Sequence, residues 1–470
     1  MNPTKKLGAR NGETPNRSHL GPAARSTLST ILTASLIAAA ACSPTEFLSV
    51  EDADNITPDD VRSPAGADAV RAGALRRLNA ATSGGESLFL LGGLFTDEWI
   101  NGDSFINRQE VDQRSIPTSN ARIETANRNL HRARVSAEQA VHFLGEFKPA
   151  GPAWEVAEMH FVQSYVVNLL AENFCSGIVI STVVDGPEEF GEPMTTTAAY
   201  ERALGHAEDG LGLVSGATPE EERVRNALTV TRARILMNLD RPDDAAAAVA
   251  GVPTDFSYQM LHSVNTTSNQ MWDLNLLQRR YSVADAEGIN GLDFASAGDP
   301  RVPVCAGGDE ACSAVEATNP LRDDLSEPLH VQLVYPTRES PVTIAGGIEA
   351  RMVDAEAQLR AGDTSGWLAT LNDARATVEG LDPLTDPGSD AARLDLLFRE
   401  RAFWLFGRGH RVGDLRRLVR QYGRSADGVF PVGAWHKGGN YGSDVTMPTP
   451  LDEQNNPNVP AGELCIDRNA

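Results

Sequence analysis

Acidic side chains near residue 100 are of the type that cleaves glycosidic bonds. Asp97 and Glu98 are adjacent, and Asp103 and Glu110 follow closely. A glycosidase needs two carboxyl groups that flank the same scissile bond. Adjacent residues on a strand or helix point in different directions. Because 64 of the 470 residues are acidic, chance proximity accounts for this group.

Other catalytic signatures are missing from the sequence. No Gly-x-Ser-x-Gly motif supplies a serine nucleophile. Gly84-Gly85 and Gly92-Gly93 lack the remainder of a nucleotide-binding loop. We therefore expect a protein that is not an enzyme and that has no catalytic residues, cofactor or metal ion.

The chemistry that remains is non-covalent capture of a ligand. The apolar faces of sugar rings stack on Trp or Tyr, and their hydroxyl groups need Asn, Asp or Arg as hydrogen-bond partners. Aromatic residues make up only 6% of the chain, so their placement is informative. The candidate ligand-binding residues, in order of preference, are Trp99, Asn101, Asp103 and Arg108, then Trp272 and Tyr281, then Trp435, His436 and Tyr441. Each aromatic candidate has the alternative role of a core anchor, and we assign Trp367 and Trp404 to the core.

A dense group of charges surrounds the predicted helix end at Gly407 and Gly409. Its members are Glu400, Arg401, Arg408, His410, Arg411, Asp414, Arg416 and Arg417. Arginine forks could clamp a phosphate or carboxylate ligand. The mixture of acids and bases favours ion pairs that lock the last helices together.

Helical periodicity dominates the elements that must position these residues. Apolar side chains recur every three and four residues and predict amphipathic helices over residues 123–144, 161–170 and 200–214. Residues 233–249 and 355–371 each indicate helix, tight polar turn, helix. Such hairpins are typical of tetratricopeptide (TPR) repeats, which bury their apolar faces on one another.

Composition divides the chain into five parts. We expect a signal peptide over 1–41, a lipid-anchored tether over 42–60 and a helical region with TPR-like hairpins over 61–250. Residues 251–345, rich in Gly, Pro, Asp, Asn and Ser, form a loop-rich insertion, and residues 346–470 form the C-terminal region. The predicted fold class is mostly α, with a TPR-like helical-hairpin scaffold and a loop-rich irregular subdomain.

The N-terminal segment predicts export. Residues 28–41 read LSTILTASLIAAAA, which is too short to span a bilayer as a helix but suits a signal-peptide core. Small residues precede Cys42, as in a bacterial lipobox, although Ala39 stands where Leu is usual. Cys42 would then be lipidated and hold the chain on a membrane. The alternative is ordinary cleavage, which leaves Cys42 incidental.

Four further cysteines predict disulfides in an exported chain. Cys305 and Cys312 flank a Gly-Gly-Asp-Glu loop and form the first expected pair, and Cys175 with Cys465 follows by elimination. A zinc site is the alternative, but no His lies at ligand spacing beside these cysteines. The net charge of -23 repels phosphate backbones, so nucleic acid is not an expected partner.

The C-terminal sequence resembles a known family. Residues 396–418 read LLFRERAFWLFGRGHRVGDLRRL, and residues 448–458 read PTPLDEQNNPN. This order is similar to the C-terminal signature of the SusD/RagB family, nutrient-binding lipoproteins of bacterial outer membranes. The match reappears at intervals back to residue 47.

The resemblance implies a SusD-like fold and a defined role. The chain would capture an oligosaccharide, or a peptide, and deliver it as a lid to a SusC-like TonB-dependent barrel. Residues 94–105 resemble the loop from which family members contact ligand. The resemblance also implies an outer-membrane location with surface exposure, and Ser43 replaces the Asp that retains lipoproteins at the inner membrane. The alternative function is a TPR-like envelope adaptor that binds other proteins.

Overall fold

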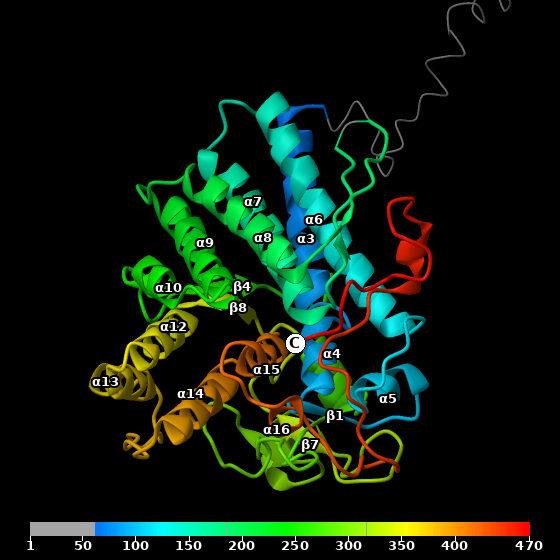
Figure 1. Ribbon diagram of the computed structural model, residues 1–470, viewed down its shortest axis with the longest axis vertical. Coiled ribbons are helices and arrows are strands. Elements are labelled where there is room, and N and C mark those ends of the chain that lie inside the picture. The colour runs from blue at the N-terminus through cyan, green and yellow to red at the C-terminus, as the bar shows by residue number, and fades with distance from the viewer. Residues whose placement is uncertain (1–61, 185, 316) are drawn as a thin grey trace, which may run out of the picture. The chain divides into compact units, whose positions relative to one another are not determined.

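Helices form most of the N-terminal half of the protein (Figure 1). The computed structural model describes residues 62–184, 186–315 and 317–470. The predicted signal peptide, Cys42 and the tether lie outside the described residues. The helices of this half are α3 (Pro64–Thr82), α4 (Leu88–Phe95), α5 (Ile106–Asp112), α6 (Ala121–Phe147), α7 (Ala153–Asn173), α8 (Thr196–Leu211), α9 (Pro219–Asn238) and α10 (Pro242–Val249).

Side-chain caps define where several of these helices begin. The Asn120 side chain accepts hydrogen bonds from the first free N–H groups of α6, and Thr195 does the same for α8. The predicted segments 123–144 and 161–170 lie inside α6 and α7. The third predicted segment extends too far, because α8 ends at Leu211, before Gly212.

The helices pack as successive neighbours, as Figure 1 shows for α3 with α6, α7 with α8, and α9 with α10. α12 (Gly347–Arg360) and α13 (Thr364–Arg375) continue the series. The two predicted hairpins are therefore α9–α10 and α12–α13. Gly362 makes the second turn at a φ of +80°, a conformation that favours glycine. The mostly α, TPR-like scaffold predicted from the sequence is confirmed.

Four short antiparallel ladders are present in the described residues, and the β1–β5 ladder joins the loop-rich region to the N-terminal half. The pairs are β1 (Trp99–Asn101) with β5 (Tyr281–Val283), β2 (Ile178–Val179) with β3 (Pro193–Met194), β4 (Ser257–Met260) with β8 (Val342–Gly346), and β6 (Val304–Ala306) with β7 (His330–Gln332). Between them lie α11 (Gln270–Trp272), the π-helical turn η1 (Asp273–Leu277) and the 3-10 turn η2 (Glu310–Val315). A small apolar cluster around Cys305, Cys312 and Val331 lies apart from the main core.

The C-terminal region packs against α4, α5 and α7. Its helices are α14 (Asp390–Trp404), α15 (Arg411–Arg420), α16 (Ala426–Val429) and the 3-10 turn η3 (Leu451–Asn455). The irregular tail then passes the end of α5, where Gly442 N donates to Gln113 O (2.7 Å), and the end of α7, where Cys175 N donates to Met447 O (2.9 Å). Disulfides join Cys175 to Cys465 and Cys305 to Cys312, the two pairings that the sequence favoured. Among the described helices, none is both long and apolar enough to cross a membrane.

The two disulfides should contribute unequally to stability. Cys175 and Cys465 are 290 residues apart, whereas Cys305 and Cys312 are 7 apart. Cross-linking a longer loop removes more entropy from the unfolded chain. We expect the Cys175→Ala, Cys465→Ala double variant to lose about 2–5 kcal/mol in urea unfolding, and the Cys305→Ala, Cys312→Ala variant to lose less. An equal loss in both would contradict this ordering.

Candidate functional site

The predicted ligand segment lies on β1 and at the start of α5. In the β1–β5 ladder, Trp99 is opposite Val283 and Asn101 is opposite Tyr281. The chain then turns at Asp103, whose carboxylate accepts a hydrogen bond from the backbone N–H of Phe105 (2.9 Å). The ladder thus places the first group of candidates beside Tyr281.

A buried network around Glu86 connects these candidates. Arg108 donates to Glu86 (Nη2 to Oε2, 2.8 Å) and also to Asp103. The Tyr281 hydroxyl donates to Glu86 (2.8 Å), and Asn101 accepts from the Asp103 backbone N–H (3.2 Å). Burial lowers the pKa of Arg108, but the hydrogen bond to Glu86 and the nearby negative charges outweigh it and raise that pKa overall. The network fixes the shape of the loop.

The expectation that these side chains are exposed is wrong. Trp99 and Tyr281 have 0% of their surface exposed, and the Trp99 ring packs on Phe406 with centroids 5.0 Å apart. The β1–β5 ladder and the charge pairing draw the segment into the core. Trp272 is half-buried beneath the guanidinium of Arg338 (5.0 Å) and packs on the separate apolar cluster. Contact of Trp99, Tyr281 or Trp272 with a ligand stays a prediction.

Apolar side chains on the outside of this loop are exposed. Phe105, Ile106 and Leu325 are 50%, 61% and 63% exposed. The Arg280 guanidinium lies over the Phe105 ring at 5.3 Å. Lys437 donates to the Asp103 carbonyl and to the carboxylate of Asp324, the neighbour of Leu325. We call this surface, formed by Phe105, Ile106, Arg280, Leu325 and Lys437, the Phe105 face.

The sequence contained part of the signal for this face. Phe105 ends the segment that resembles a ligand loop, yet pattern alone favoured the larger Trp99. The other members of the face come from distant parts of the chain. Only the folded structure shows that Arg280 lies over the Phe105 ring and that Lys437 joins Asp103 to Asp324, the neighbour of Leu325.

The third group of candidates lies in a closed polar cluster. Trp435 Nε1 donates to Asp112 Oδ2 (2.8 Å), and His436 Nε2 lies at the same distance from that oxygen. The Tyr441 hydroxyl donates to Glu287 (2.5 Å). Ligand atoms of Asp112, Glu287 and His436 lie within 4.8 Å of one another, a spacing that could hold a cation. Burial and the charge of Asp112 raise the pKa of Glu287 well above its usual value.

Asp97 and Glu98 have structural partners. Asp97 accepts two hydrogen bonds from Arg411 (2.6 and 2.7 Å). Glu98 Oε1 accepts from the backbone N–H of Gly407 (3.0 Å). Both acids are buried, with 0% and 1% of their surface exposed. They hold the turn between α14 and α15 and do not face a substrate.

The charged C-terminal block forms ion pairs between helices, as the sequence predicted. Arg401 makes a two-bond contact with Asp414 (3.0 and 2.8 Å). Arg417 Nη2 donates to Glu356 of α12 (3.0 Å) and to Asp414 (3.0 Å). Burial raises the pKa of Asp414, but Arg401 and Arg417 more than reverse this and hold it at about 2. These arginines therefore serve the scaffold.

A cavity on another part of the surface could also take a ligand. It has a volume of about 470 Å³ and lies between α8, the end of α9, α15 and the C-terminal tail. Tyr200, Asp240 and Arg420 contribute to its lining.

Comparison with solved structures identifies the fold. A crystal structure of a SusD superfamily protein from Parabacteroides distasonis superposes with a TM-score of 0.64 and 14% identity, over 86% of this chain and 98% of that one. A SusD-like carbohydrate-binding protein from Bacteroides fragilis gives a TM-score of 0.62 and 13% identity, over 84% and 98% of the two chains. A SusD/RagB family protein from Bacteroides thetaiotaomicron gives 0.53 and 11%, over 74% and 86%. No protein-family model and no curated protein matches the chain.

Burial of Glu98 makes a prediction about pH. Burial raises the pKa of Glu98 to about 8 from a usual value of 4.5. The folded chain then holds a proton that the unfolded chain releases, so the free energy of unfolding falls as pH rises from about 4.5 to about 8, by at most ~1.4 kcal/mol per pH unit. Glu98→Gln should make this fall less steep in thermal unfolding at pH 5 to 8.

An exposed acid on α8 provides the control. Glu201→Gln should leave the slope unchanged. An identical slope in the parent chain and in Glu98→Gln would show that Glu98 is ionised throughout. Glu349, whose pKa burial raises to about 7, accounts for part of the slope that remains in either variant.

Proposed function

We propose that this chain, whose fold is that of the SusD superfamily, captures a nutrient and delivers it to a transporter. The observation that carries the proposal is the match over 84% of the chain to a SusD-like carbohydrate-binding protein. The nutrient is an oligosaccharide or a peptide, and the transporter is a SusC-like TonB-dependent barrel of the outer membrane. Because one fold can host several functions, the proposal also needs a binding surface and a membrane anchor.

The Phe105 face is the binding surface that we propose. An exposed Phe ring offers an apolar surface to the C–H face of a sugar or to an apolar peptide side chain. Arg280 and Lys437 lie at its edge and can donate hydrogen bonds to hydroxyl or carbonyl oxygens. The Glu86 network beneath it holds the loop in one shape, which reduces the entropy lost on binding. Capture of this kind makes and breaks no covalent bond.

Lipidation of Cys42 would provide the anchor. Several acyl chains on one residue give stable attachment to a membrane. The chain would then act as a lid on the barrel, in a hinge motion that encloses the ligand.

Replacement of Phe105 tests the binding surface. We expect Phe105→Ala to weaken the best-binding glycan or peptide from a screen by about tenfold, since loss of a stacking ring costs about 1.4 kcal/mol. The measurement is isothermal titration calorimetry. Phe190→Ala is the matched control, because Phe190 is 45% exposed elsewhere and should leave the affinity unchanged. Equal effects of the two substitutions would reject the Phe105 face.

Affinity purification from native membranes tests the transport role. A tagged chain should recover a TonB-dependent barrel in a stoichiometric amount, and Cys42→Ala should lose both membrane attachment and the barrel. Recovery of soluble envelope proteins without a barrel would contradict the lid and favour the TPR-like adaptor.

A further inference from the structure

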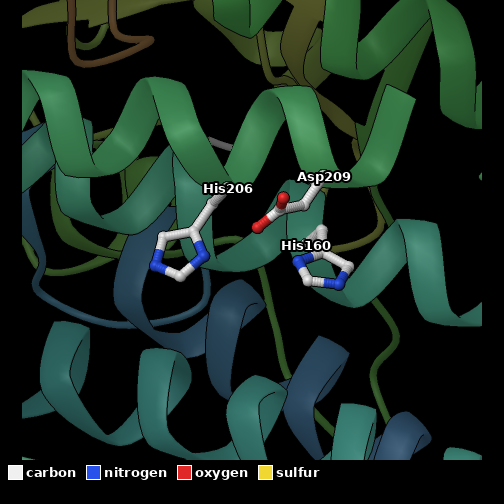
Figure 2. A group of neighbouring side chains, drawn as sticks. All are labelled: His160, His206 and Asp209. Carbon is white, nitrogen blue, oxygen red and sulfur yellow. The ribbon is translucent and has the colours of Figure 1, made fainter. Parts of the chain in front are cut away.

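Two helices of the scaffold bring together three residues that ligate transition metals. His160 comes from α7, and His206 and Asp209 come from α8 (Figure 2). A ring nitrogen of each histidine and a carboxylate oxygen of the aspartate lie within 4.8 Å of one another. Figure 2 shows the three side chains pointing toward a common point between the helices. We propose that these residues bind one divalent transition-metal ion of the zinc class.

Local sequence accounts for the geometry. His206 and Asp209 are three residues apart on a helix, so their side chains share one face. Gly210 lets α8 approach α7 closely, because a Cβ at this position would lie 3.0 Å from the Cβ of His160 and 2.9 Å from Leu228. The glycine thus brings His160 within reach of the two ligands on α8.

The state of the histidines fits the proposal. His160 Nδ1 is buried and has no hydrogen-bond partner among the described residues, which is costly for a polar atom that is not ligated. Burial lowers the pKa of His160, and burial together with Arg202 lowers that of His206 to about 4. Both shifts favour the neutral imidazole, which is the form that binds metal.

Ligand type and number indicate the metal. Imidazole with one carboxylate suits zinc and its transition-metal neighbours, whereas calcium and magnesium prefer oxygen ligands. In a tetrahedral zinc site with bonds of about 2.0–2.1 Å, ligand atoms are about 3.4 Å apart, so small side-chain rotations suffice. Asp209 is exposed and leaves the fourth position open to water.

Nearby positive charge sets the expected strength. Arg134 and Arg202 lie close enough to His206 to lower its pKa, and they also oppose a bound cation. Glu138 pairs with Arg134 (3.0 Å) and offsets part of this effect. We therefore expect micromolar affinity. The sequence predicted no zinc site because no His lies at ligand spacing beside the cysteines. That argument does not apply to this site, because its ligands come from two separate helices and include no cysteine.

Zinc titration of the full chain tests the site. Calorimetry with Zn²⁺ alone, on protein first treated with a chelator, should give one ion per chain and a rise in melting temperature. Asp209→Asn and His206→Ala should each weaken binding at least tenfold and abolish the rise. Both positions are at least partly exposed, so the variants should fold.

His142→Ala is the matched control. His142 lies 3.1 Å from Glu146 on α6, a His–carboxylate pair with no third ligand among the residues that the structure describes, and its loss should leave binding unchanged. Failure to bind zinc, or equal binding by the parent chain, His206→Ala and Asp209→Asn, would overturn the proposal. The proposal is independent of nutrient capture, and neither result alters the test of the Phe105 face.

Discussion

Charge pairing around α15 is the constraint on which the rest of the structure depends. Arg411 pairs with Asp97 at the end of α4, and Arg417 pairs with Glu356 of α12. Arg401 of α14 pairs with Asp414 of α15. All of these groups are nearly inaccessible to water. A buried ion pair contributes little net stability, but loss of one partner costs about 3–5 kcal/mol, because the other charge is left buried alone. The pairs therefore fix how α15 fits against α14, α12 and the segment that follows α4.

The ligand loop inherits its position from this constraint. Asp97 is held by Arg411, and Glu98 accepts the backbone N–H of Gly407. The next residue, Trp99, begins β1 and packs on Phe406. Four and nine residues after Trp99, Asp103 and Arg108 belong to the Glu86 network. Phe105 lies in an exposed stretch, residues 104–106, between Asp103 and Arg108, which are buried and paired with each other. Residues 97–105 thus connect the scaffold to the proposed binding surface, and Asp97 and Asp103 in this segment are each paired with an arginine.

Much of the fold could be predicted from the sequence, because helices and hairpins follow from local periodicity. Periodicity predicts the hairpins α9–α10 and α12–α13. The mixture of acids and bases in the C-terminal block predicts its ion pairs. Exposure could not be predicted in the same way. Trp99, Asn101, Asp103 and Arg108 have the residue types of a ligand site, but long-range pairing with Glu86 and β5 buries them. The sequence also does not show that Arg280 and Lys437 belong to the face. They are far from Phe105 in the chain, and only the fold places Arg280 over its ring and Lys437 on the Asp103 carbonyl.

The central claim is that ligand binds at the Phe105 face, and hydrogen–deuterium exchange of the full chain with and without its best-binding glycan or peptide tests it most directly. Bound ligand should slow exchange in residues 103–109, 323–326 and 434–440, which carry or adjoin the Phe105 face. Protection confined to residues 195–200, 238–240 and 416–421, around the cavity lined by Tyr200 and Arg420, would contradict the account.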